Sequence, residues 1–151
     1  MGRILIMATG LALALGTSRG ARGTTIGLER VDGSRLDYHL DRRDGRSRQP
    51  VLVMLQGSGC DSVATNDRIA GMAPRLAPRH ALITIEKYGV EPGADGQLCS
   101  DAYWRGNTLT RRVLDVLEVI AALRRERWWN GELVLFGGSE GGAVAAMAAP
   151  L

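Results

Sequence analysis

The sequence predicts an α/β fold in which a mostly parallel sheet follows an N-terminal antiparallel hairpin. From residue 51 onward, short apolar runs alternate with segments of helical spacing, and this order is typical of parallel strands joined by crossover helices. Upstream, the pair Asp32-Gly33 separates two strand-like segments and predicts a hairpin turn. The chain has 151 residues, of which 45% are hydrophobic, enough for one domain around one core.

The predicted strands of the hairpin are residues 24–31 and 35–40, and a charged loop at 42–49 follows them. Pro50 then opens an uninterrupted apolar run at 51–55. A strand buried on both faces of a parallel sheet has this composition, whereas a half-exposed strand alternates apolar and polar residues. The run 51–55 is therefore predicted to lie inside the sheet.

A helix and a short strand are predicted next. Asn66 or Asp67 caps the helix, because both side chains can accept a hydrogen bond from the first turn. The helix ends near Leu76, before Pro78. The apolar residues 81–85 form the strand.

The segment 88–106 is predicted to be a long loop, because it contains several glycines and a proline. Asn107 or Thr108 caps the helix that follows it, and Asn130-Gly131 separates that helix from the next strand. The apolar residues of this helix fall on one stripe at helical spacing: Leu109, Val113, Val116, Leu117, Ile120 and Leu123.

The last predicted strand, 132–136, leads through a glycine-rich turn into a helix of small residues at 143–149. Ser139 stands at the apex of the turn, with Gly137 and Gly141 two positions away on either side. These glycines leave room where side chains would collide with the neighbouring strand and helix. The turn therefore presents a serine hydroxyl next to a helix N-terminus, whose partial positive charge favours a developing anion.

This strand, turn and helix resemble the G-x-S-x-G nucleophile elbow of the α/β-hydrolase family. A second segment, 56–59 (Gln-Gly-Ser-Gly), follows the buried strand and resembles the H-G-x-G oxyanion loop of that family, with glutamine in place of histidine. The resemblance covers residues 24–151, about the first half of the usual fold. It is closest to exported bacterial hydrolases that carry a G-G-S-E-G-G elbow.

The resemblance implies a serine hydrolase that acts on ester or other acyl bonds of small molecules, peptide and thioester bonds included. It implies that Ser139 is the nucleophile, and that the backbone N–H groups of Glu140 and Ser58 bind the oxyanion. Gly57 and Gly59 are then structural glycines of the second loop, as Gly137 and Gly141 are of the elbow. The resemblance implies neither a cofactor nor a metal.

The glycine-rich segments allow other interpretations. A strand-to-helix turn without chemistry remains an alternative for the elbow. Phosphate binding fits less well, because residues 137–142 lack the Gly-Lys-Ser/Thr ending of a P-loop. In the earlier loop, Ser62 occupies the position where the G-x-G-x-x-G fingerprint has its last glycine.

The remaining members of a catalytic triad are not found after the serine. In the family the triad runs serine, acid, histidine along the chain. After Ser139 the only acidic residue is Glu140, and the two histidines of the chain, His39 and His80, both precede it. The sequence therefore predicts the N-terminal portion of a hydrolase domain, at 24–151, that lacks the C-terminal strands and has little or no turnover.

Without those strands, residues 132–136 are expected to form an exposed, apolar sheet edge. The alternative function is then a non-catalytic, hydrolase-like module that binds a small ligand or a partner chain. Such an edge can pair with a strand supplied by another chain.

Residues 1–20 are typical of a secretory signal peptide: Arg3 precedes an apolar run at 4–15, and small residues follow at cleavage spacing. The run is shorter than the roughly 20 apolar residues that a membrane span needs. We therefore expect an exported protein, periplasmic or secreted, without a stable membrane span. A buried first strand or a wrongly chosen start codon are the alternatives, and the chain would then be cytoplasmic.

If the chain is exported, we expect a disulfide between Cys60 and Cys99, and such a bond stabilises a fold by about 2–4 kcal/mol. In a reducing compartment they would be two unrelated thiols. Neither has a second cysteine or a histidine at ligand spacing, so no metal is expected.

The net charge is +3, but the arginines are scattered and aromatic residues make up only 5%. This pattern indicates a solvated surface and no nucleic-acid partner.

Overall fold

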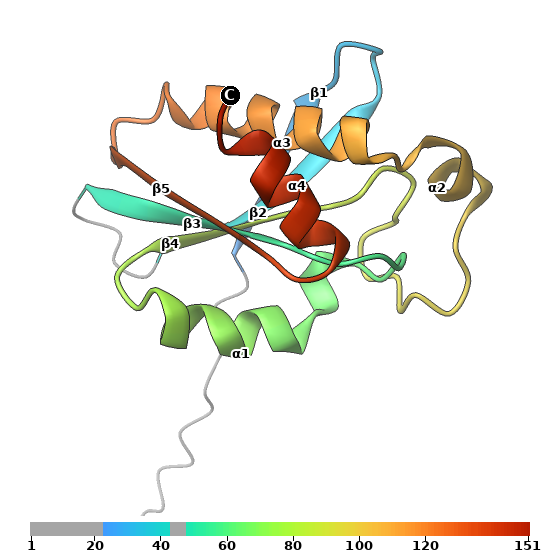
Figure 1. Ribbon diagram of the computed structural model, residues 1–151, viewed down its shortest axis with the longest axis horizontal. Helices are drawn as coiled ribbons and strands as arrows, with labels where there is room; N and C mark the ends of the chain where they lie inside the picture. Colours follow the sequence, from blue (N-terminus) through green and yellow to red (C-terminus); the bar gives the residue numbers. More distant parts are fainter. Residues whose placement is uncertain (1–22, 43–47) are drawn as a thin grey trace, which may run out of the picture.

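The computed structural model describes residues 23–42 and 48–151, so the predicted signal peptide at 1–20 lies outside the described residues (Figure 1). The strands are β1 (Thr24–Glu29), β2 (Arg35–Asp41), β3 (Gln49–Leu55), β4 (Ala81–Ile85) and β5 (Trp129–Gly137). The helices are α1 (Asp67–Leu76), α2 (Asp101–Gly106), α3 (Leu109–Leu123), α4 (Glu140–Ala148) and the short 3-10 helix η1 (Val63–Thr65). Across the described ranges, none of these helices has the length and apolar character needed to cross a bilayer.

The five strands form one mixed sheet in the order β1-β2-β4-β3-β5. β3 runs parallel to both β4 and β5, while β1 and β2 form an antiparallel hairpin that joins the sheet at β4. The order of the parallel strands differs from their order in the sequence, which requires the helical crossovers that the sequence predicted. The α/β fold with an N-terminal hairpin is therefore confirmed.

Helices cover both faces of the sheet: α3 and α4 lie on one face and α1 lies on the other (Figure 1). Val51 and Val53 of β3 pack in the core on the α3 and α4 side, whereas Leu52 and Met54 pack against α1. All four side chains are at most 2% exposed. The uninterrupted apolar run at 51–55 is explained by this two-sided burial, as the sequence predicted.

β5 pairs only with β3 and therefore forms one edge of the described sheet. Leu133 and Leu135 pack against the core beneath α3 and α4. Val134 and Phe136 point to the opposite face and are 43% and 37% exposed. The strand that leads into the glycine-rich turn, β5, is thus an apolar edge strand.

The first strand ends two residues earlier than predicted. Val31 is 99% exposed and belongs to the hairpin turn, where Gly33 has a φ of 79°. Arg30 leaves the strand and turns inward, where its Nε donates to Asp115 of α3 at 2.7 Å. A strand pattern read from hydrophobicity alone could not anticipate this buried ion pair.

The segment 88–106 is not a loop throughout, because its last six residues form α2. The Ser100 side chain caps that helix by accepting from the Tyr103 N–H, and Asp101 lies in its first turn. Asn130-Gly131 is likewise not a boundary before β5 but lies within the strand. Gly131 has a φ of 95°, and the register against β3 shifts at this point, as in a β-bulge.

Candidate functional site

Three segments meet where the parallel strands end. Residues 57–60, called here the β3 loop, follow β3; Lys87 follows β4; and Ser139 follows β5. Parallel sheets bind ligands at the carboxyl ends of their strands, because the loops that converge there can present side chains and N–H groups together. The candidate active site consists of Ser139, the β3 loop and the residues that hold them.

Ser139 has an unusual backbone conformation, with φ 53° and ψ −126°. Among the described residues it is the only non-glycine residue with a positive φ. Such a conformation costs about 1–3 kcal/mol and persists only where the surrounding structure enforces it. Here the surroundings are β5 on one side and α4, which begins at the next residue, on the other.

The two glycines that flank Ser139 allow this tight turn. A Cβ on Gly137 would lie 2.2 Å from the backbone carbonyl of Gly141. A Cβ on Gly141 would lie 2.3 Å from the carbonyl oxygen of Leu55, at the end of β3. Both positions therefore require glycine, because α4 packs directly onto the ends of β5 and β3. Gly138, in contrast, has nothing within 4 Å of the corresponding position.

The β3 loop lies against Ser139. A Cβ on Gly57 would be 3.4 Å from the Ser139 Cβ and 3.9 Å from its Oγ. Within the described part of the chain, the N–H groups of Ser58 and Glu140 have no hydrogen-bond acceptor. The N–H of Gly59, in contrast, donates to the Tyr103 hydroxyl at 3.1 Å. Two unpaired N–H groups thus lie in the residues next to Ser139 and next to Gly57.

Lys87, the single lysine of the chain, holds the β3 loop from the protein interior. Its side chain is buried, and its Nζ donates to the carbonyl oxygen of Gly57 at 3.2 Å and also to that of Gly59. Burial lowers the pKa of the Lys87 ammonium, and the nearby Arg112 lowers it further, while neighbouring carboxylates oppose the shift.

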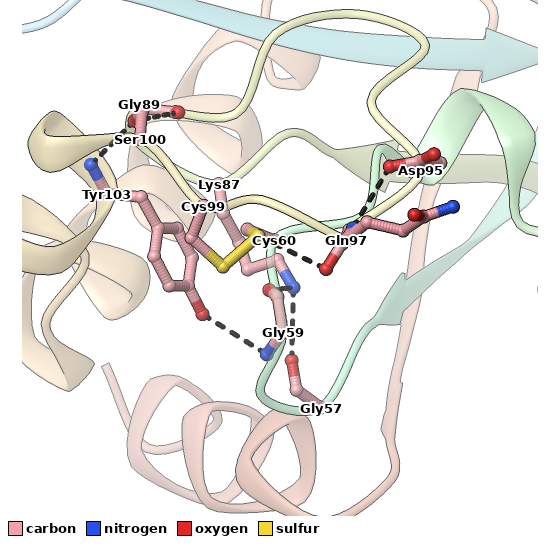
Figure 2. The surroundings of a disulfide bond; sticks show 11 residues. Gly57, Gly59, Cys60, Lys87, Gly89, Asp95, Gln97, Cys99, Ser100 and Tyr103 are labelled. Carbon is pink, nitrogen blue, oxygen red and sulfur yellow. Dashed lines mark hydrogen bonds between the residues drawn. A yellow bond between two sulfur atoms is a disulfide. The ribbon is translucent and has the colours of Figure 1, made fainter.

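The other end of the β3 loop is held by the segment that leads into α2 (Figure 2). Cys60 and Cys99 form a disulfide bond with their Cα atoms 5.4 Å apart. Tyr103, in the first turn of α2, accepts the hydrogen bond from Gly59. Ser100 donates to the carbonyl oxygen of Gly89 at 2.6 Å and so ties the start of α2 to the loop that follows β4.

Arg112 connects the two sides of the site. It lies on α3 and is 5% exposed. Its Nη2 donates to the carbonyl oxygen of Gln56 at 2.6 Å, and its Nη1 donates to Glu140 Oε1 at 2.5 Å. One buried guanidinium therefore contacts the residue before the β3 loop and the residue after Ser139. The Gln56 side chain donates to Asp61 instead, at 3.0 Å.

Neither histidine lies beside Ser139. His39 is on β2, where its Nε2 is 3.1 Å from Glu86 Oε1. β2 is separated from β5 by β4 and β3, and three strand spacings amount to about 14 Å. His80 precedes β4 and so lies at the opposite end of the parallel strands from Ser139. In residues 23–42 and 48–151, no cluster of three histidines, cysteines or acidic residues is arranged to hold a metal ion.

Sequence analysis missed Lys87, Arg112 and Tyr103. Lys87 could have been noticed as the single lysine, placed just after a predicted buried strand. Arg112 lies three residues after Leu109 and four before Val116, so it falls on the apolar stripe of its helix. A charged residue on such a stripe is a signal of a buried ion pair or polar contact. Tyr103 carried no comparable signal, because α2 was not predicted.

No protein-family model and no curated protein matches the sequence. Solved structures match the fold. An esterase from Pyrobaculum calidifontis superposes with a TM-score of 0.59 and 20% identity, over 86% of this chain and 39% of that one. Brefeldin A esterase, a bacterial homologue of human hormone sensitive lipase, matches with a TM-score of 0.60 and 19% identity, over 93% and 38%. DcsB, in complex with its substrate analogue, matches with 0.62 and 16%, over 85% and 41%.

The chain spans well under half the length of these solved structures, between 38% and 41%. By its structure, the chain therefore contains part of the α/β-hydrolase fold.

Proposed function

We propose that this chain carries the nucleophile and the oxyanion-binding groups of a serine hydrolase that cleaves esters or related acyl bonds in small molecules. The observation that carries this proposal is the positive φ of Ser139 between β5 and α4. Such strain at a serine is typical of a nucleophile elbow. The esterases that share the fold support the choice of an acyl substrate.

In the proposed reaction, Ser139 Oγ attacks the acyl carbon and the carbonyl oxygen becomes an oxyanion. The N–H groups of Glu140 and Ser58 then donate to that oxygen, and the N-terminus of α4 adds partial positive charge. Neither N–H is engaged by an acceptor among the described residues, so no internal hydrogen bond has to break first. Donors fixed in advance stabilise the transition state without reorganisation.

We further propose that the 151-residue chain has little turnover by itself, because no histidine lies next to Ser139. A serine hydroxyl is a weak nucleophile until a base takes its proton. A serine hydrolase without its base retains only the residual rate that the oxyanion donors and substrate binding provide. The Cys60–Cys99 bond is consistent with an oxidising compartment and supports export as part of the proposal.

A fluorophosphonate is expected to modify the purified chain slowly and at one residue, Ser139. The oxyanion donors favour the reaction, while the absence of a nearby base limits its rate. Intact mass and peptide mapping follow the modification over hours. In Ser139→Ala the adduct should be absent. Ser34→Ala, in the exposed hairpin turn, is the matched control and should react like the wild type.

Two results would contradict parts of this proposal. Equal modification of the wild type and Ser139→Ala would refute the nucleophile assignment. Rapid, complete modification of the wild type, as in complete serine hydrolases, would refute the claim of low turnover. The disulfide has to remain oxidised throughout, because the β3 loop includes Cys60.

The alternative function, binding of a partner strand, is favoured by the exposed edge of β5. Val134 and Phe136 stand on that edge with large exposed fractions. Beside it, an apolar cavity of about 610 Å³ opens between β5, α3 and α4. It is lined mainly by Leu117, Ile120, Leu133, Leu135, Ala145 and Ala148. A strand added to β5 would pair its free backbone groups and cover this apolar surface.

If β5 pairs with another strand, the purified chain should self-associate as its concentration rises. Size-exclusion chromatography with light scattering measures this. Val134→Lys places a charge on the edge and is expected to restore the monomer. Val31→Lys, in the fully exposed hairpin turn, is the control and should leave association unchanged. A wild-type chain that stays monomeric at all concentrations would argue against edge pairing.

A further inference from the structure

We propose that Lys87 is a positioning residue that fixes the peptide unit between Gly57 and Ser58, so that the Ser58 N–H faces the reacting acyl group. This inference rests on the proposed function of Ser139 and Ser58. A buried lysine, distant in sequence from both the β3 loop and the turn at Ser139, would thus control the direction of one of the two oxyanion donors.

The geometry of the peptide bond carries the argument. The described part of the chain has no cis peptide bond. In a trans peptide unit the carbonyl C=O and the following N–H point in opposite directions. Lys87 Nζ holds the Gly57 carbonyl toward the protein interior. The Ser58 N–H, which belongs to the same peptide unit, is therefore turned away from Lys87, to the open side on which the exposed Ser139 lies.

Other contacts restrain the rest of the β3 loop but not this peptide unit. The Gly59 N–H is held by Tyr103, and Cys60 is held by its disulfide to Cys99 (Figure 2). Among the described residues, Lys87 is the donor that reaches the Gly57 carbonyl. A loop containing two glycines has considerable backbone freedom. Without Lys87, the Gly57–Ser58 peptide could rotate while both ends of the loop stayed fixed.

The environment of Lys87 is costly for a side chain with a purely structural role. An ammonium group that is buried without a carboxylate at ion-pair distance destabilises a folded protein. In residues 23–42 and 48–151, no carboxylate lies within ion-pair distance of Lys87, and its hydrogen-bond acceptors are the Gly57 and Gly59 carbonyls. A buried positive charge behind the β3 loop favours a negative charge that develops in front of it.

The first measurement examines the ammonium group itself. Because the chain has one lysine, [15N]lysine labelling gives one side-chain NMR signal. We expect its protons to exchange with water at least tenfold more slowly than those of free lysine. In Lys87→Met, the carbonyl carbon signals of Gly57 and Gly59 should shift, and the Ser58 amide should shift with them. Tyr103→Phe is the matched control: it should move the Gly59 amide and leave the Gly57 carbonyl in place.

The second measurement separates positioning from general destabilisation. Lys87→Met is expected to lower the rate of fluorophosphonate modification of Ser139 by about tenfold, since one oxyanion donor loses its alignment. Ile69→Ala, which removes core contacts on the α1 face of the sheet, provides a destabilised control and should change the rate less than twofold. Lys87→Gln, which keeps a donor without the charge, should recover part of the rate.

Rapid ammonium exchange, or an unchanged Gly57 carbonyl signal in Lys87→Met, would overturn the proposal. So would equal loss of reactivity in Lys87→Met and Ile69→Ala. If Ser139 of the wild type is not modified at all, the nucleophile assignment fails instead. The ammonium exchange and carbonyl shifts then decide the role of Lys87 by themselves, because neither depends on the reactivity of Ser139.

Discussion

Replacing Gly141 by alanine is expected to lower the free energy of unfolding by at least about 3 kcal/mol. A Cβ at this position would lie 2.3 Å from the carbonyl oxygen of Leu55 and 2.5 Å from that of Gln56. Both atoms belong to the backbone, so no change of rotamer relieves the contact. Helix α4 would have to move away from the end of β3, which would also displace Ser139.

Helix propensity alone predicts the opposite sign for this substitution. Alanine is favoured over glycine by about 1 kcal/mol inside a helix. Gly71 of α1 provides the matched control, because it is helical and has nothing within 4 Å of the corresponding Cβ position. Gly71→Ala should therefore stabilise the chain. Urea unfolding followed by tryptophan fluorescence measures both variants, and a stabilising Gly141→Ala would refute the close packing of α4 on β3.

The elbow could be predicted from sequence because all of its requirements lie within a few consecutive residues. Gly137 and Gly141 are needed where backbone segments approach, and Ser139 stands between them. The buried strand at 51–55 was predictable for a similar reason, since burial on two faces leaves an uninterrupted apolar run. Sequence patterns that span a few consecutive residues therefore predict the backbone structure of those same residues.

The side chains that hold the site in place could not be predicted in the same way, because their roles depend on contacts between segments that are distant in the sequence. Lys87 reaches Gly57 and Gly59 only after β4 has been placed beside β3. The same is true of Arg112, which needs α3 packed over the sheet to reach both Gln56 and Glu140. Charged residues are usually exposed, so a sequence pattern does not predict that Lys87 and Arg112 are buried at the site.

Replacing Arg112 by methionine is expected to lower the free energy of unfolding by about 2–3 kcal/mol. The substitution leaves the Gln56 carbonyl without its donor and the Glu140 carboxylate without its partner. Breaking a fully buried pair costs about 3–5 kcal/mol. The expected loss is smaller here, because the Glu140 side chain is 30% exposed and water can solvate part of its charge.

Arg111, the preceding residue on α3, is the matched control. Its ion pair with Asp32 lies at the surface, with 28% and 46% of the two side chains exposed, so Arg111→Met should destabilise the chain much less than Arg112→Met. A double-mutant cycle of Arg112→Met and Glu140→Gln should give a coupling of at least about 0.5 kcal/mol. Because Arg112 contacts both sides of the site, its variant should also slow the modification of Ser139, whereas Arg111→Met should not. Equal costs for the two arginine variants, or an additive cycle, would mean that Arg112 does not couple the β3 loop to α4.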